Sequence, residues 1–147
     1  MLVARKRALS GVAGLTAAAS AVLVLAVPGT SHAASYWIGD CDKSAATGDA
    51  GANDMVATLR KRSDALKHAY ASFRGKGETL YIYNKAGAAM TFRLDWANGS
   101  KLEKSWDWSL GTGESKSVDF NIPEGRTVFL RIGTPGGDDS AYCKGKA

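Results

Sequence analysis

The sequence of 147 residues is poor in proline, cysteine and histidine, with 3, 2 and 2 residues of each. Two cysteines exclude a cysteine-dense mini-protein, and three prolines exclude a collagen-like rod. Charged residues make up 22% of the chain and apolar residues 45%, a balance that excludes a disordered tail. The length suits one domain. The composition is that of an ordinary globular protein, so the useful information lies in local patterns.

The first 33 residues have the organisation of a secretory signal peptide. A basic cluster at residues 5–7 precedes nineteen uncharged residues at 9–27, and the small residues Ser31 and Ala33 provide a cleavage site after Ala33. An uncleaved anchor is the alternative, because a membrane-spanning helix needs about 20 apolar residues. Cleavage removes three of the 19 basic residues, so the net charge falls from +5 to +2. We expect a secreted, extracellular protein.

Cys41 and Cys143 both remain after cleavage and bracket most of the mature chain. In an exported protein a single pair of cysteines predicts a disulfide, and only one intramolecular pairing exists. A metal pair or a reactive thiol fits less well, because the sequence has no C-x-x-C motif and His68 is the one histidine left after cleavage. We predict a structural Cys41–Cys143 disulfide, and we expect no metal and no other cofactor.

The mature chain divides into a short N-terminal part and one larger unit. Residues 34–52 are rich in Ala, Gly, Ser and Asp and predict a loop or edge segment. From Asn53 the large apolar residues recur at helical spacings, which predicts an amphipathic helix over about residues 53–74. The stripe of this helix consists of Met55, Leu59, Leu66, Tyr70 and Phe73.

After Gly77 the apolar period changes to two, which predicts β-strands near residues 80–83, 90–96, 102–110, 118–122 and 127–132. The turns between them are short, and Asn98-Gly99 is a favoured hairpin dipeptide, so the pairing is expected to be antiparallel. We therefore predict a mainly β fold. It is a small antiparallel β-sandwich or meander with one amphipathic helix, stapled by a disulfide, and residues 53–147 form its single β-rich domain.

Groups that support catalysis are scarce. The mature chain has one histidine and no G-x-S-x-G, H-E-x-x-H or P-loop signature. Asp95, Asp107 and Asp119 fall on the outward faces of predicted strands, where the carboxylates of a weak hydrolase are a minor alternative. Asp138-Asp139 in a Gly-rich loop is a similarly weak candidate for calcium. We expect a protein that is not an enzyme.

Aromatic and basic side chains supply the candidate binding surface. Trp96, Trp106 and Trp108 lie on the apolar sides of their strands, which favours core packing over a ligand platform. The basic side of the predicted helix has two interpretations. It binds an anionic surface, or it simply faces solvent while the apolar stripe packs on the sheet. Tyr81 or Tyr83 joins the candidate exposed aromatics. The candidate surface-binding residues are Arg60, Lys61, Lys67, Arg74, Tyr36 and Trp37.

Three stretches after Gly77 carry a loose resemblance to a known class of proteins. They read LYIYNKAGAAMTFRLDW from residue 80, KSWDWSLGTGESKSVDFNIPEG from residue 104, and RTVFLRIG from residue 126. This order of strand and turn motifs resembles that of small β-sandwich modules of secreted actinobacterial proteins, which are similar to the C-terminal membrane-recognition domain of thiol-activated cytolysins. The resemblance covers residues 80–132 and implies the fold. It transfers no functional residue, because the shared motifs are turn and core residues and the Trp-rich undecapeptide is absent.

These observations predict a secreted, non-catalytic binding or interaction module that acts at an extracellular surface. Its expected partner is an anionic cell-surface polymer, a glycan or an extracellular protein, and nucleic acid is not expected. A membrane-active, cytolysin-like protein with peripheral membrane contact is one alternative. An inhibitor of a secreted enzyme is the other.

Overall fold

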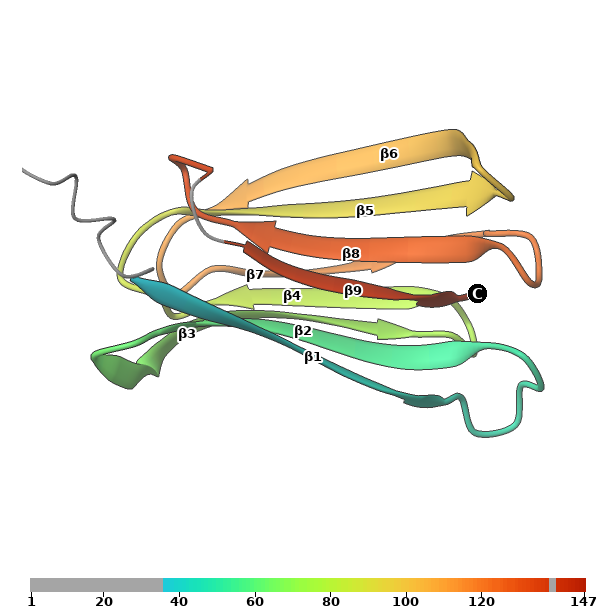
Figure 1. Ribbon diagram of the computed structural model, residues 1–147, viewed down its shortest axis with the longest axis horizontal. Helices are drawn as coiled ribbons and strands as arrows, with labels where there is room; N and C mark the ends of the chain where they lie inside the picture. Colours follow the sequence, from blue (N-terminus) through green and yellow to red (C-terminus); the bar gives the residue numbers. More distant parts are fainter. Residues whose placement is uncertain (1–35, 138–139) are drawn as a thin grey trace, which may run out of the picture. The chain divides into compact units, whose positions relative to one another are not determined.

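The computed structural model describes residues 36–137 and 140–147, and these form nine β-strands (Figure 1). The strands are β1 (Trp37–Ala45), β2 (Asn53–Lys61), β3 (Asp64–Arg74), β4 (Thr79–Asn84), β5 (Met90–Asn98), β6 (Lys101–Leu110), β7 (Ser115–Asp119), β8 (Thr127–Gly133) and β9 (Ser140–Lys146). The predicted signal peptide over residues 1–33, its cleavage site, and Asp138-Asp139 lie outside the described residues.

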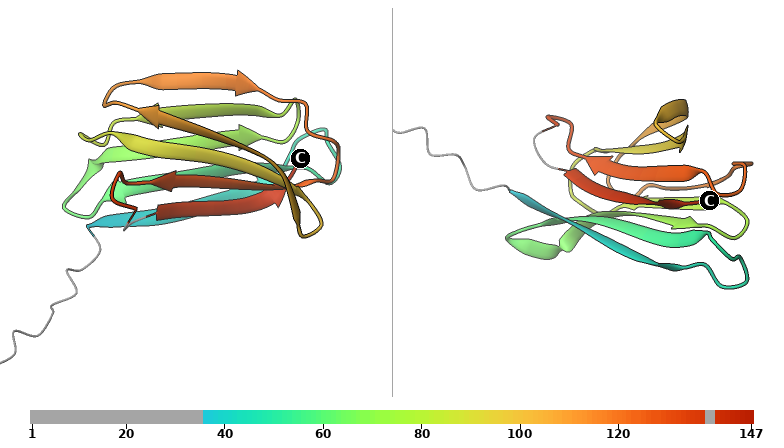
Figure 2. Two further views of the ribbon diagram at one scale, coloured as in Figure 1. Left: turned by 90° about the horizontal axis from the view of Figure 1, so that it is seen from above. Right: turned by 45° about the vertical axis from the view of Figure 1, so that its right-hand side comes forward.

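The strands build two antiparallel sheets that face each other (Figures 1 and 2). Sheet A has the order β1-β2-β3-β4-β7, and sheet B has the order β6-β5-β8-β9. The predicted antiparallel sandwich is confirmed, as is the hairpin at Asn98-Gly99 between β5 and β6. The meander order is wrong, because the chain crosses between the sheets after β4, after β6 and after β7.

The predicted amphipathic helix over residues 53–74 is wrong, because this segment is the β2–β3 hairpin. Its inward positions alternate as in a strand, but alanines occupy half of them: Ala57, Ala69 and Ala71 are fully buried. The large apolar residues of this segment, taken alone, recur at the spacing of a helix. When the buried alanines are included, the buried positions recur every two residues, which is the period of a strand. The helix propensity of residues in this segment is overridden, because β2 and β3 are both internal strands of sheet A and pair on both sides.

The two edge strands beside the disulfide also differ from the expectation. Within the segment 34–52, predicted as a loop or edge segment, β1 is an edge strand paired with β2, and it extends to Ala45, further than a short edge segment before Cys41. The last strand, β9, was not predicted. Neither strand shows a run of large apolar residues, because inward positions near the disulfide are held by Gly39 and Cys41 in β1 and by Cys143 and Gly145 in β9.

The core lies between the sheets and is apolar. Trp96, Trp106 and Trp108 are partly buried and pack against it, and the rings of Trp106 and Trp108 both contact Phe120. The predicted core role of these tryptophans is therefore confirmed. The largest fully buried side chains are Phe73, Phe92, Met55, Leu59, Leu80, Ile82, Met90, Leu94, Ile122, Leu130, Ile132 and Val128.

The predicted Cys41–Cys143 disulfide is confirmed, and it joins β1 of sheet A to β9 of sheet B. Figure 2 shows these two strands side by side along one margin of the sandwich. A Cβ at Gly39 would collide with the backbone of Ser140 and Ala141, and one at Gly145 would lie 2.6 Å from Met55 Sδ. The absence of a side chain two residues from each cysteine therefore lets the sheets approach closely where the disulfide joins them.

The side chain of Asn84 organises the crossovers between the sheets at one end of the sandwich. It is fully buried, and its amide nitrogen donates to the carbonyls of Ala88 and Leu110 at 2.8 Å each. Its carbonyl oxygen accepts a hydrogen bond from the Ala86 amide at 2.8 Å. The β4–β5 loop is thereby attached to the end of β6, where the chain leaves sheet B for β7.

Removal of the disulfide by Cys41→Ala with Cys143→Ala is expected to lower the free energy of unfolding by about 4 kcal/mol, since the bond closes a loop of about 100 residues in the unfolded chain. Denaturant unfolding of the variant and the oxidised parent measures this difference. An unchanged transition midpoint would contradict a structural role for the bond.

Replacement Asn84→Ala is expected to lower the free energy of unfolding by about 3 kcal/mol. The loss follows because three hydrogen bonds disappear and three backbone groups at the crossover lose their partners. Thermal and denaturant unfolding measure the change. The control is Asn121→Ala, an exposed position where a change within about 0.5 kcal/mol is expected; equal effects of the two variants would refute the role given to Asn84.

Candidate functional site

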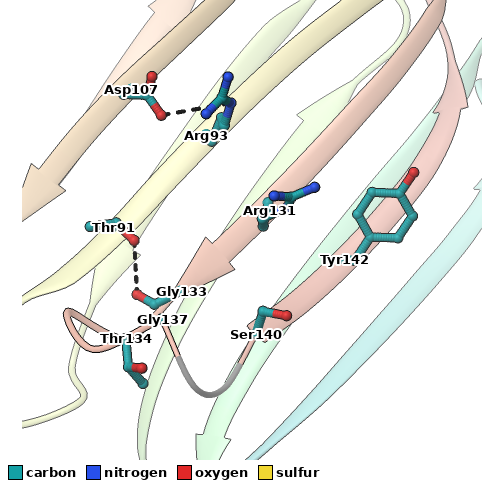
Figure 3. A pocket seen from close by; sticks show the side chains of 9 residues that line it. All are labelled: Thr91, Arg93, Asp107, Arg131, Gly133, Thr134, Gly137, Ser140 and Tyr142. Atoms are coloured by element: carbon teal, nitrogen blue, oxygen red, sulfur yellow. Dashed lines mark hydrogen bonds and ion pairs between the residues drawn. The ribbon is translucent and has the colours of Figure 1, made fainter.

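The outer face of sheet B carries a polar groove with a volume of about 500 Å³ (Figure 3). It is built across all four strands of the sheet, because residues at matching register positions on β6, β5, β8 and β9 project to the same side. Its lining residues are Thr91, Arg93, Asp107, Arg131, Gly133, Thr134, Gly137, Ser140 and Tyr142. We call this feature the sheet B groove.

Arg93 is held between two carboxylates at one side of the sheet B groove. Its Nε donates to Asp95 Oδ1 at 2.9 Å and lies 3.8 Å from Asp107 Oδ1, and its Nη2 donates to Ser105 Oγ at 3.2 Å. The hydrogen bond to Asp95 raises the pKa of Arg93 above its ordinary value, and the charges of both carboxylates act in the same direction. Arg93 therefore remains a cation and orients the acceptor Asp107 within the groove.

Arg131 and Tyr142 form the other side of the sheet B groove, on neighbouring strands at paired positions. The Arg131 guanidinium lies 5.8 Å from the centre of the Tyr142 ring, which is 46% exposed. Tyr142 also stacks on Phe129, with ring centroids 6.1 Å apart. Among residues 36–137 and 140–147, no carboxylate lies within 4 Å of the Arg131 guanidinium.

The sheet B groove is lined mainly by polar side chains. It combines guanidinium donors, a carboxylate acceptor, hydroxyl groups and an exposed aromatic ring. Asp95 and Asp107 both engage Arg93, whereas Asp119 lies on sheet A and accepts a hydrogen bond from Thr79 at 2.9 Å. The three aspartates considered as hydrolase carboxylates are thus divided between the two sheets. Within the described part of the chain, no group of three or more metal-ligating side chains is found.

Three of the sequence-predicted surface residues come together where β1 begins and β2 ends. Trp37 pairs with Lys61 across the strands, and the Lys61 ammonium lies 4.7 Å from the centre of the Tyr36 ring. Tyr36 is 54% exposed, as expected, whereas Trp37 is half-buried and packs against the core. Arg60 is also at this end, and its Nε forms an ion pair with Asp40 at 3.0 Å.

Lys67 and Arg74 do not share one basic flank, because the helix that would align them is absent. Lys67 lies at the start of β3, with its alkyl chain beside Gly87 of the β4–β5 loop. Arg74 ends the same strand, six residues beyond the partner of Arg60, which places it about 20 Å away along the sheet.

The outer face of sheet A holds a cluster of aromatic rings that the sequence indicated only in part. The ring centroid of Tyr70 lies 5.7 Å from that of Tyr81, 5.9 Å from that of Tyr83 and 6.4 Å from that of His68. Tyr81 is 38% exposed, which confirms the expectation for it, and Tyr83 is half-buried. A shallow depression of about 390 Å³ beside Tyr70 and Tyr81 also contains Arg74 and Lys76.

No family model matches the sequence, and no match is found among curated proteins or solved structures. The described residues include no helix of the length and apolar character needed to cross a membrane.

The phenols of Tyr36 and Tyr70 are expected to ionise at different pH values. The hydrogen bond with Lys61 lowers the pKa of Tyr36 below its ordinary value of about 10, whereas burial raises the pKa of Tyr70. A pH titration of the tyrosine ring carbons by NMR should show Tyr36 ionising first. Lys61→Gln should move only Tyr36 toward its ordinary value, and simultaneous titration of the two rings in the parent protein would contradict the assigned contacts.

Proposed function

We propose that this protein is secreted and acts as a non-catalytic module that binds an acidic glycan in the sheet B groove. The observation that carries the proposal is the combination of Arg131, which has no carboxylate at ion-pair distance among the described residues, with the exposed Tyr142 ring beside it. Secretion rests on the signal peptide predicted from the sequence, and the disulfide is compatible with it.

The side chains of the sheet B groove match the functional groups of a sugar. Sugar hydroxyls both donate and accept hydrogen bonds, and the groove offers donors in Arg93 and Arg131 and an acceptor in Asp107. The apolar face of a pyranose ring suits an exposed aromatic ring such as Tyr142. A carboxylate on the sugar would pair with Arg131 in a forked, charge-assisted geometry.

The shape of the sheet B groove favours a polymer over a small compact ligand. It is a shallow feature of a sheet face, whereas pockets for small molecules enclose most of the ligand surface. The groove crosses four strands, so a chain of several sugar units has room to contact Asp107 at one side and Tyr142 at the other (Figure 3). Binding of this kind needs no catalytic group.

The mature protein is expected to bind polygalacturonate more tightly than a neutral galactan in isothermal titration. Arg131→Gln should weaken polygalacturonate binding about tenfold and leave the neutral polymer unaffected, because a hydrogen bond to a charged group is worth about 1.5 kcal/mol or more. Tyr142→Ala should weaken binding of any sugar polymer that binds, because the stacking surface is lost.

The matched control is Tyr81→Ala, which removes a similarly exposed tyrosine from the outer face of sheet A. It should leave both affinities unchanged. The proposal fails if neither polymer binds, or if Tyr81→Ala weakens binding as much as Tyr142→Ala does.

A further inference from the structure

Leu66 is the most exposed large apolar side chain in residues 36–137 and 140–147, at 74%. It lies at the tip of the β2–β3 hairpin, where the register changes. Arg60 pairs with His68, but the next residue, Lys61, pairs with Asp64, so Ala65–Lys67 have no partner in β2. These three residues therefore bulge out of the sheet, with Leu66 at their centre.

The backbone of Leu66 has internal partners although its side chain faces solvent. Its N–H donates to Asp64 Oδ1 at 3.1 Å, and its carbonyl oxygen lies 3.0 Å from His68 Nδ1. Transfer of an unpaired backbone group into lipid is costly, so a segment that enters a membrane interface needs such partners. The backbone of Leu66 meets this requirement in the present conformation of the hairpin.

Basic residues flank the exposed leucine along the chain. Residues 61–67 include Lys61, Arg62 and Lys67, and Asp64 is the single acid in this stretch. The Arg62 amide donates to the Tyr36 carbonyl at 3.0 Å, which brings the half-exposed Tyr36 ring to this end. We call Leu66 with Lys61, Arg62, Lys67 and Tyr36 the hairpin tip, and it projects from the end of sheet A at the left of Figure 1.

We propose that the hairpin tip is a membrane-contact site that inserts Leu66 into the interface of an anionic phospholipid bilayer. A leucine flanked by cations matches an apolar layer bordered by anionic headgroups, and an amphipathic tyrosine suits the boundary between them. A soluble polyanion would use the cations but would gain nothing from Leu66. A protein interface needs about 800 Å² from each partner, far more than one leucine supplies.

The expected binding is peripheral and reversible, because each basic residue near an anionic surface contributes only a modest attraction and one leucine adds a short apolar anchor. This contact is independent of the sheet B groove and of any glycan. The two proposals therefore stand or fall separately.

Sedimentation with vesicles of equal parts phosphatidylglycerol and phosphatidylcholine tests the proposal, with pure phosphatidylcholine vesicles as the neutral comparison. The parent protein should bind the anionic vesicles and not the neutral ones. Leu66→Ser should weaken partitioning about tenfold, equivalent to about 1.4 kcal/mol. The double variant Arg62→Gln with Lys67→Gln should weaken it by a factor of ten or more, since each charge is worth about fivefold.

Matched controls distinguish binding through the hairpin tip from non-specific hydrophobic or electrostatic binding to the vesicles. Leu102→Ser removes a leucine that is 53% exposed beside the β5–β6 turn, and Lys76→Gln with Lys101→Gln removes two charges from other turns. Neither control should alter partitioning by more than about twofold beyond the small uniform effect of lower net charge.

A tryptophan at the apex reports insertion directly. The fluorescence of Leu66→Trp should shift to the blue with anionic vesicles and be quenched by brominated acyl chains. The proposal is overturned if the parent does not bind anionic vesicles, or if Leu66→Ser binds them as tightly as the parent. It is also overturned if the brominated acyl chains do not quench the new tryptophan. That result would mean that the basic residues contact headgroups or a polyanion and that residue 66 does not insert.

Discussion

The join between β1 and β9 is the constraint on which the arrangement of the two sheets depends. Backbone hydrogen bonds hold each sheet together internally, and at this margin one covalent bond joins sheet A to sheet B. Two hydrogen bonds accompany it, from Lys43 Nζ to the Lys144 carbonyl and from the Lys146 amide to Asn53 Oδ1. Cys41 and Cys143 supply the bond. Gly39 leaves room for β9 against β1, and Gly145 leaves room for Met55 of β2 against β9. The pattern Gly-x-Cys in β1 and Cys-x-Gly in β9 follows from the alternation of side chains along a strand, since residues two apart face the same side.

The same alternation separates core from surface throughout the sandwich. On β5 the inward Phe92 and Leu94 are buried, and the residue between them, Arg93, faces out into the sheet B groove. On β6 the tryptophans that resemble a ligand platform in the sequence face the core, and Asp107 between them is the residue that reaches the groove. The side chains of the sheet B groove therefore occupy the polar positions of strands whose apolar positions stabilise the fold, so they can change without loss of the core.

The sequence was sufficient for the five strands between Gly77 and Gly133 and for the disulfide, because most of those strands alternate large apolar residues with polar ones and the cysteines have a single pairing. It was insufficient for β2 and β3, where alanines carry the alternation, and for β9, where glycine and cysteine hold inward positions. Tyr36, Lys61 and Lys67 are identified as surface residues from local sequence, although Lys61 and Lys67 were assigned to a helix over residues 53–74, which is the β2–β3 hairpin. Arg131 and Tyr142 were missed, because no local pattern relates them; they are neighbours only through the pairing of β8 with β9.

The two proposed contacts lie toward the same end of the sandwich. Ser140, which lines the sheet B groove, packs so closely on Gly39 that no side chain fits there, and Gly39 is two residues from the strand position that pairs with Lys61 of the hairpin tip. The groove and the tip are thus connected through the start of β1, beside the disulfide that joins the sheets. Because β1 is held on both sides, by β2 and by the bond to β9, the spacing between the two contacts is fixed. A protein docked through Leu66 would hold the groove in the layer next to the membrane, where an acidic polymer anchored at that surface would be within reach.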